Sequence, residues 1–365
     1  MTNVFFPFIC SRLLVKASGC MLLWLLLGVD IRAQEGAKYI YSFLRLSPSA
    51  RITALGGNNV SIVSSDPSVV LHNPASLNAA MHRSVLFSGV VYPGQTHHGQ
   101  AAYTHNFKKA GVWQFGIQYL AYGRQQATDI SGNITGSFQS GDMCVYGGGG
   151  WRFARILSVG ATAKLIYSQL GPYSSVGMAV DIGFTVHDST RLITASLVAR
   201  NAGIAFKPYV PGSAGQLPFD LIAGFSLGLK KTPFRLHVQI HDLHNWNLTY
   251  ADPNDQSGQN LFSAAAESTA PKKNIADEIF RHFIFGLEAD IKKVVRLSLA
   301  YNHQRQRELN LLDRRGAPGL SGGLGLKIKQ FDFGYGFALL SQGASQHHFT
   351  LSVKTDGFIR RKSPQ

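Results

Sequence analysis

Long apolar runs, charge and cysteine are all scarce in this chain of 365 residues. No window holds the ~18 consecutive apolar residues of a transmembrane helix, which excludes a protein that crosses the membrane with helices. Charged residues make up only 15% of the chain and hydrophobic ones 45%, so the chain is large but poor in charge. Cys10 and Cys20 lie in a predicted leader, and Cys144 alone cannot form an intramolecular disulfide even in an oxidising compartment.

The amino terminus has the pattern of a secretory signal peptide. A short apolar run, Met21–Val29, follows Arg12 and Lys16 and precedes Ile31-Arg32-Ala33. A basic region, a short apolar run and small residues at its exit predict export, with residues 1–33 removed by cleavage after Ala33. The alternative is an uncleaved anchor.

Basic residues outnumber acidic ones, and the formal net charge of +15 falls to about +13 once the leader is removed. The basic residues are scattered, and no basic helix or aromatic-interleaved patch suggests nucleic acid as a partner. Lysine pairs stand at Lys108-Lys109, Lys230-Lys231 and Lys292-Lys293, where tight periplasmic turns are expected. Attraction to anionic lipid headgroups and lipopolysaccharide fits this distribution, and simple solubility of the rims is the alternative.

Apolar and polar residues alternate through most of the chain. In Ile156–Ser168, Leu157, Val159 and Leu165 share one face, while Ser158, Thr162 and Lys164 share the other. Val176–Val186 repeats the pattern. Successive side chains of a strand point to opposite faces, so each segment has an apolar and a polar wall. The polar wall is rich in glycine and carries charge, which suits the interior of a barrel.

Fourteen such segments predict an all-β fold, a transmembrane antiparallel β-barrel of about 14 strands spanning residues 84–354. The strands are expected at 84–92, 99–106, 111–121, 141–152, 156–168, 174–187, 190–201, 219–229, 234–242, 280–289, 294–302, 321–328, 331–338 and 347–353. Most approach the ~9–11 residues of a tilted membrane strand, and an even number puts both barrel ends on one side. The alternative is a large soluble all-β domain.

The connections alternate between short and long, as in outer-membrane barrels. Tight periplasmic turns are expected at Phe107–Ala110, Phe153–Arg155, Asp188–Ser189, Lys230–Pro233, Asp290–Lys293 and Lys329–Gln330. External loops are expected at Tyr122–Ser140, Ala202–Pro218, Leu243–Ile279 and His303–Leu320.

A turn-rich segment, residues 34–83, precedes the barrel. Its distinctive residues are Gly56, Gly57, Asn58, Asp66, Asn73 and Pro74. Glycine pairs and Asn-Pro are turn chemistry, and a compact segment of this kind could fold into the lumen as a plug or hatch. The alternative is a periplasmic arm outside the barrel.

Catalytic and metal-binding patterns are weak. His241 and His244 flank Asp242 without a second cluster, so no metal site is predicted, and His241-Asp242 is expected to fix a strand exit by hydrogen bonds. Gly147–Gly150 lacks the lysine of a phosphate loop and is expected to permit close backbone approach or a bend. The apolar faces carry no Ser, His and carboxylate trio, so neither an enzyme nor a cofactor is expected.

The longest predicted loop is the candidate partner-binding element. Leu243–Ile279 is far longer than a hairpin connection needs. It holds Trp246 and Tyr250, aromatic types that anchor interfaces, and Asp252 and Asn254 complete the predicted contact residues.

The chain also resembles known barrels. Asp66 with Asn73-Pro74-Ala75 resembles the hatch of barrels similar to the long-chain fatty acid transporter. The order of short motifs from Phe43 to Ser352 resembles the PorQ family of the type IX secretion system. These motifs are Ser49-Ala50-Arg51, Ala54-Leu55-Gly56-Gly57-Asn58-Asn59, Gly132-Asn133-Ile134-Thr135-Gly136, Leu217-Pro218-Phe219-Asp220, His241-Asp242-Leu243, Leu248-Thr249-Tyr250, Asp252-Pro253-Asn254, Arg281-His282, Phe285-Gly286 and Tyr301-Asn302. The tail, residues 355–365, departs from the barrels that end on an aromatic residue of the last strand; Phe358 is its nearest aromatic residue.

The resemblance implies a role in protein secretion without catalysis. Members of the family are outer-membrane components of the secretion apparatus of the Bacteroidota. They act with PorU, PorV and PorZ in the attachment complex, where a partner sortase joins cargo to anionic lipopolysaccharide, and the family holds PorZ at the surface. The hatch similarity leaves an alternative, a transporter of hydrophobic small molecules.

Overall fold

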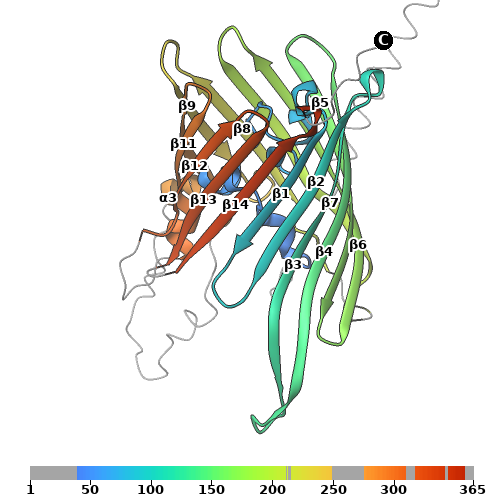
Figure 1. Cartoon of the computed structure of the whole chain (residues 1–365). Coiled ribbons are helices and arrows are strands. Elements are labelled where there is room, and N and C mark those ends of the chain that lie inside the picture. The colour runs from blue at the N-terminus through green and yellow to red at the C-terminus, as the bar shows by residue number, and fades with distance from the viewer. Residues whose placement is uncertain are drawn as a thin grey trace, which may run out of the picture. The chain divides into compact units, whose positions relative to one another are not determined.

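The computed structural model describes residues 39–210, 212, 215–248, 275–309, 317–341 and 344–357. Within them, each strand pairs antiparallel with its neighbours in the sequence, and the first pairs with the last, which closes a barrel (Figure 1). The strands are β1 Ser84–Val91, β2 His97–Asn106, β3 Val112–Thr128, β4 Ile134–Arg152, β5 Leu157–Leu170, β6 Tyr173–Asp188, β7 Ile193–Lys207, β8 Asp220–Gly228, β9 Phe234–Ile240, β10 Phe283–Ile291, β11 Val295–Asn302, β12 Leu320–Ile328, β13 Phe331–Ser341 and β14 Ala344–Lys354. The prediction of a 14-strand antiparallel barrel is confirmed.

The helices are short. They are η1 Ser42–Arg45, α2 Ala50–Ala54, η2 Pro67–Val69, η3 Pro74–Ser76, η4 Ala79–Met81, η5 Lys108–Ala110, α3 Ile275–Arg281, α4 His303–Glu308 and η7 Thr355–Gly357. Among the described residues, no helix has the length and apolar character to cross a membrane. The predicted leader, residues 1–33, lies outside the described residues.

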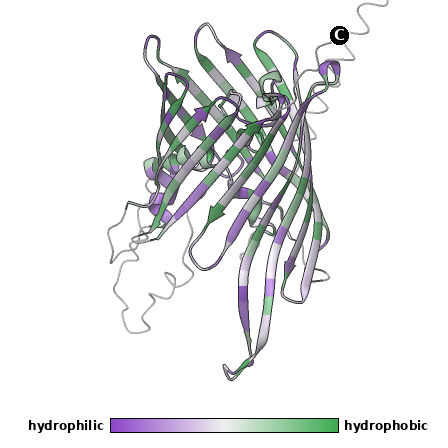
Figure 2. Cartoon of the chain, viewed as in Figure 1, coloured by the Kyte–Doolittle hydropathy of each residue, from purple (hydrophilic) through white to green (hydrophobic). Residues whose placement is uncertain are grey.

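The alternation read from the sequence matches the two faces of the wall. In β5, Leu165 and Tyr167 are 64% and 41% exposed, while Lys164 and Ser168 are buried. Figure 2 shows hydrophobic and hydrophilic residues alternating along the strands. Many apolar side chains of the strands are exposed on the outside, whereas the interior is lined by polar side chains together with apolar ones such as Leu86, Leu120 and Ile166, which pack against the segment before β1. An apolar exterior of this width is unfavourable in water and favourable in a lipid bilayer. The chain is therefore an outer-membrane type of barrel.

The two rims of the barrel differ. The tight turns at 107–111, 153–156, 189–192, 229–233, 292–294 and 329–330 lie at the rim where Ser84 pairs with Lys354, as expected for the periplasmic side. The opposite rim carries the longer connections, α3 and α4 (Figure 1). This rim is the extracellular one.

One predicted loop is wrong. Most of Tyr122–Ser140 is strand, because β3 and β4 continue to pair with each other beyond the barrel, from Arg124 opposite Gln139 to Thr128 opposite Ile134. The resulting hairpin projects from the extracellular rim (Figure 1). Its Gln, Ser, Thr and Gly residues lack a buried face, so they do not alternate as a wall strand does. For the same reason β7 continues to Lys207, and the loop predicted at Ala202–Pro218 is shorter.

The segment before β1 fills the lumen. It begins at the extracellular rim, where the Ile40 amide donates to the Gln216 carbonyl at 2.9 Å. It ends at the periplasmic rim, where the Arg83 carbonyl accepts from the Thr355 amide at 2.9 Å. Between these points its helices contact the inner wall: α2 packs on β11 to β14, and η3 packs on β4 to β6 (Figure 1). The segment 39–83 is hereafter called the plug.

Glycines on the inner wall let the plug approach the strands. Gly150, Gly160 and Gly183 lie side by side across β4, β5 and β6. A Cβ on Gly160 would lie 2.3 Å from the carbonyl carbon of Pro74, and one on Gly150 would lie 2.6 Å from Cβ of Leu77. The close backbone approach expected at Gly147–Gly150 is thus confirmed at Gly150.

Candidate partner-binding surface

Hydrogen bonds join Arg45, Asp220, His241 and Asp242 where β9 ends at the extracellular rim, and we call this cluster the lock. The Asp242 amide donates to Oδ1 of Asp220 at 2.8 Å, and Arg45 of the plug donates to Oδ1 of Asp242 at 2.5 Å. Nδ1 of His241 lies 3.1 Å from Oδ2 of Asp242. The strand-exit role expected for His241-Asp242 is confirmed, and Arg45 adds a tie to the plug that the sequence did not reveal.

The charge of Asp242 is held by these neighbours. Burial alone would raise the pKa of this carboxyl, but the hydrogen bond from His241 and the Arg45 guanidinium outweigh burial and hold the pKa well below its usual range. The Asp242 carboxylate therefore stays ionised at neutral pH and keeps its ion pair with Arg45.

Asp220, Asp242 and His244 could supply ligand atoms to one cation, because these atoms lie within 4.8 Å of one another. Both carboxylate oxygens of Asp242 already face Arg45 or His241, however, and the His244 ring packs edge-on against Phe219 at 5.0 Å. The arrangement acts as an ion-paired lock, and we assign no metal to it.

Above the lock, apolar side chains are exposed on the extracellular side. Trp246 is 58% exposed and its ring lies 5.0 Å from that of the buried His282. On α3, Ile275, Ile279 and Phe280 are 68%, 44% and 50% exposed. We call these four residues the rim patch. Phe280 also packs against Phe283 of β10, with ring centroids 6.3 Å apart. Exposed aromatic and aliphatic side chains at this rim are candidate contacts for another molecule.

An ionic clasp holds α3 against α4. Asp277 on α3 pairs with Arg281 at 3.0 Å, with His303 at 3.0 Å and with Arg307 at 2.5 Å. Although burial opposes the shift, these hydrogen bonds lower the pKa of Asp277 to about 2. The clasp fixes the helix that carries most of the rim patch.

The structure describes only one of the four predicted partner-binding residues. Trp246 lies in the rim patch, whereas Tyr250, Asp252 and Asn254 lie outside the described residues. The sequence analysis did not single out Ile275, Ile279 and Phe280. Ile279 and Phe280 stand four and five residues after Ile275, and a run of polar residues precedes Ile275. In the sequence, this spacing was the signal for a short helix with one apolar side.

The hatch residues all shape the plug. Gly56 and Gly57 end α2 with positive φ values of 93° and 88°, a conformation that favours glycine. Asn58 accepts a hydrogen bond from Arg200 of β7 at 3.2 Å.

Two further hatch residues cap the short helices that follow. Asp66 accepts from the Ser68 amide at 2.9 Å, and Asn73 accepts from the Ala75 amide at 2.9 Å. Asn73 also donates to the Val60 carbonyl at 2.6 Å and to Thr185 of β6 at 2.9 Å. Pro74 follows that cap, where its missing N–H leaves no donor unsatisfied.

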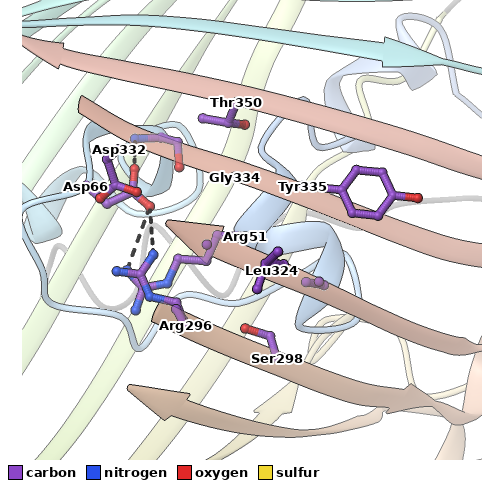
Figure 3. A pocket seen from close by; sticks show the side chains of 13 residues that line it. Arg51, Asp66, Arg296, Ser298, Leu324, Asp332, Gly334, Tyr335 and Thr350 are labelled. Atoms are coloured by element: carbon purple, nitrogen blue, oxygen red, sulfur yellow. Dashed lines mark hydrogen bonds and ion pairs between the residues drawn. The ribbon is translucent and has the colours of Figure 1, made fainter. Parts of the chain in front are cut away.

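Opposite charges join the plug to the wall deep in the lumen (Figure 3). Arg51 donates to both carboxylate oxygens of the buried Glu288, at 2.9 and 2.6 Å. Arg51 and Arg296 also lie 3.7 and 3.9 Å from Asp66. The neighbouring cavity, of about 20 Å³, holds about one water molecule.

A separate apolar groove of about 590 Å³ lies on the outer face of β1 and β12–β14, lined by Phe87, Leu324, Leu326, Phe333, Tyr335, Phe349 and Leu351 among others. The strands pair continuously beneath it, from Gly325 opposite Gly334 to Gly334 opposite Thr350. The groove is therefore a surface for lipid, separated from the lumen by an unbroken wall.

No known family model and no curated protein matches the chain. Among solved structures, it is similar to the monoaromatic hydrocarbon channel CymD, with 12% identity, TM-score 0.47, and 86% of this chain and 97% of that chain covered. It is also similar to the Pseudomonas putida toluene transporter TodX, with 11% identity, TM-score 0.43, and 82% and 95% covered. A third match is the KdgM porin, with 9% identity, TM-score 0.33, and 74% and 98% covered.

The class of protein follows from the chain's own geometry. A closed antiparallel barrel with an apolar exterior, whose interior is occupied by the segment before β1, is an outer-membrane β-barrel. The similar solved structures are described as channels, a transporter and a porin, and at this level of similarity no role of theirs is assigned to this chain.

Proposed function

We propose that this barrel is a PorQ-like outer-membrane component of the type IX secretion system that anchors the attachment complex at the cell surface. PorZ is its expected direct partner, with PorU and PorV in the same complex, and the lipopolysaccharide linked to cargo lies close by. The single observation that carries the proposal is the rim patch, an apolar surface held rigidly at the extracellular end of a plugged barrel.

Three features support a docking role for this rim. Trp246 and Phe280 are aromatic types that anchor interfaces. The Asp277 clasp and the Arg45–Asp242 lock keep the patch in one geometry, which limits the entropy lost when a partner binds. The family resemblance runs through the same region, at His241-Asp242-Leu243 and Arg281-His282.

The lumen offers little to the alternative, a transporter of hydrophobic small molecules. Such a transporter needs an apolar lumenal pocket and an opening in the wall. In the described residues, the cavity beside Arg51 is charged and about 20 Å³ in volume, the cavity of about 590 Å³ at the periplasmic rim is lined by lysine and arginine side chains, and the wall at Gly334 is closed. Loss of hydrophobic-substrate uptake on deletion of the gene, with PorZ still at the surface, would favour the transporter.

The test replaces part of the rim patch. In the double variant Ile279→Ser/Phe280→Ser we expect the amount of PorZ retained on intact cells to fall about tenfold or more, because losing anchor residues costs over about 1.4 kcal/mol of binding. Surface immunolabelling of PorZ, normalised to the amount of folded barrel, measures the effect.

Ile130→Ser/Ile134→Ser is the control, because it removes two apolar side chains of the β3–β4 hairpin that are even more exposed, at 107% and 64%. Its PorZ level is expected to equal that of the wild type. Full retention of PorZ by the rim-patch variant, or by a chain lacking residues 255–275 of the predicted loop, would contradict the proposal.

A further inference from the structure

A lumenal cavity in the described part of the chain opens at the periplasmic rim. It measures about 590 Å³, within the range of small-ligand sites. One side is the plug, at 63–64 and 75–80, and the other is the inner wall of β3 to β6 with the turns at 107–111 and 153–156. We call it the rim cavity.

The rim cavity is lined by cations and by no carboxylate. Lys108, Lys109, Arg152 and Arg155 contribute to it, and His187 lies in its wall. All four cations are exposed, and none of them has an ion pair within the described part of the chain. The neighbouring Asp188 lies outside the lining and is engaged by Thr190 and Arg191. Four like charges in one concavity attract an anion.

Aromatic side chains place this rim at the level of the lipid headgroups. Trp113 and Trp151 pack edge-to-face at 5.6 Å, and both donate to the Ala110 carbonyl, at 2.8 and 3.1 Å. Their bonds fix the turn that carries Lys108 and Lys109. Tryptophans of this kind form the interfacial belt of membrane proteins.

The apolar rings beside the cations face lipid rather than the cavity. Phe107 and Phe153, at the same two turns, are 50% and 76% exposed. An amphiphile could rest its chains on these rings while its headgroup turns over the rim toward the cations. A soluble anion would use only the cations and would gain nothing from the rings.

We propose that the rim cavity binds the phosphate of an anionic phospholipid headgroup from the periplasmic leaflet of the outer membrane. Lys108, Lys109, Arg152 and Arg155 contact the phosphate oxygens, and arginine does so with two parallel N–H groups. The bound lipid bridges the plug and the barrel wall, which closes the periplasmic end of the lumen. The proposal is independent of the proposed secretion role, because it concerns the opposite rim.

Native mass spectrometry of the purified full-length barrel in non-ionic detergent tests it, with phosphatidylglycerol and phosphatidylcholine as probes. Phosphatidylglycerol is expected to remain bound at least tenfold more than phosphatidylcholine. The variant K108Q/K109Q/R152Q/R155Q is expected to lose that preference. The charge-conserving variant R152K/R155K is expected to keep most of it, which separates loss of charge from misfolding.

The control K230Q/K231Q/K292Q/K293Q removes four equally exposed cations from other turns of the same rim and is expected to retain the lipid. Equal loss in both quadruple variants would overturn the proposal, since it would show a diffuse charge effect. Displacement of the lipid by millimolar inorganic phosphate would also overturn it, since the site would then take a free anion.

Discussion

Arg51 and Glu288 show how single residues decide whether the plug stays in place. Their side chains are 8% and 0% exposed, and the pair is the shortest link between α2 and the wall at β10. A buried carboxylate that loses its ion-pair partner destabilises the folded protein. Arg51 also holds Ser64 at 2.8 Å, so one side chain joins two parts of the plug to the barrel.

Arg51→Ala is expected to lower the free energy of unfolding by about 3–5 kcal/mol, because Glu288 loses its bidentate partner and keeps a buried charge beside the more distant Arg296. Urea unfolding of the barrel in detergent micelles, followed by tryptophan fluorescence, measures the change. Arg83→Ala is the control: its pair with Asp356 is 41% and 49% exposed and contributes about 0–1 kcal/mol. Equal effects of the two variants would contradict a structural role for the buried pair.

At the scale of elements, short helices dock on rows of glycine. The row Gly150, Gly160 and Gly183 receives η3, and Gly323 and Gly336 receive α2, where added Cβ atoms would lie 2.6 Å from Cβ of Ala54 and 2.3 Å from the Ala50 carbonyl oxygen. Small residues on the wall thus define where each turn of the plug lies.

Gly160→Ala is expected to displace η3 and leave the barrel closed. The added methyl group overpacks the contact with η3, which destabilises the docked plug by about 1–3 kcal/mol, whereas the strand pairing of the wall is unchanged. Hydrogen exchange of the Ala75 and Leu77 amides should accelerate about tenfold, while strand amides stay protected. Gly89→Ala is the control, since its Cβ would meet nothing within 4 Å. Unchanged exchange at η3 would show that the plug does not depend on this contact.

At the scale of the whole molecule, the plug determines what the barrel can pass. The strand number lies between that of small barrels filled by side chains and that of open porins. The plug occupies the lumen, with α2 packed on β11 to β14 and η3 packed on β4 to β6, and buried apolar clusters join it to the wall. The extracellular rim presents the rim patch and the periplasmic rim presents the rim cavity, so the two proposed binding surfaces lie at opposite ends of the barrel.

Deleting residues 42–78 is expected to turn a barrel with little ion conductance into a conducting pore, because the lumen loses its filling while the wall keeps all its pairings. Single-channel recording in planar bilayers measures this. Deleting residues 124–139 is the control, since it shortens the hairpin and leaves the plug untouched. Wild-type conductance after plug deletion would mean that another part of the chain closes the pore.

The sequence by itself determined the barrel, the strand number and the wall faces, because the period of two is a local property of each strand. Lys164 could be assigned to the interior from its neighbours alone. Tertiary structure decided the rest. Whether Tyr122–Ser140 forms loop or strand depends on pairing across the hairpin, from Arg124 opposite Gln139 to Thr128 opposite Ile134, which the alternation of residue types does not reveal. The plug's path depends on contacts such as Arg51–Glu288, 237 positions apart. The rim patch and the rim cavity likewise gather residues that only the closed barrel brings together.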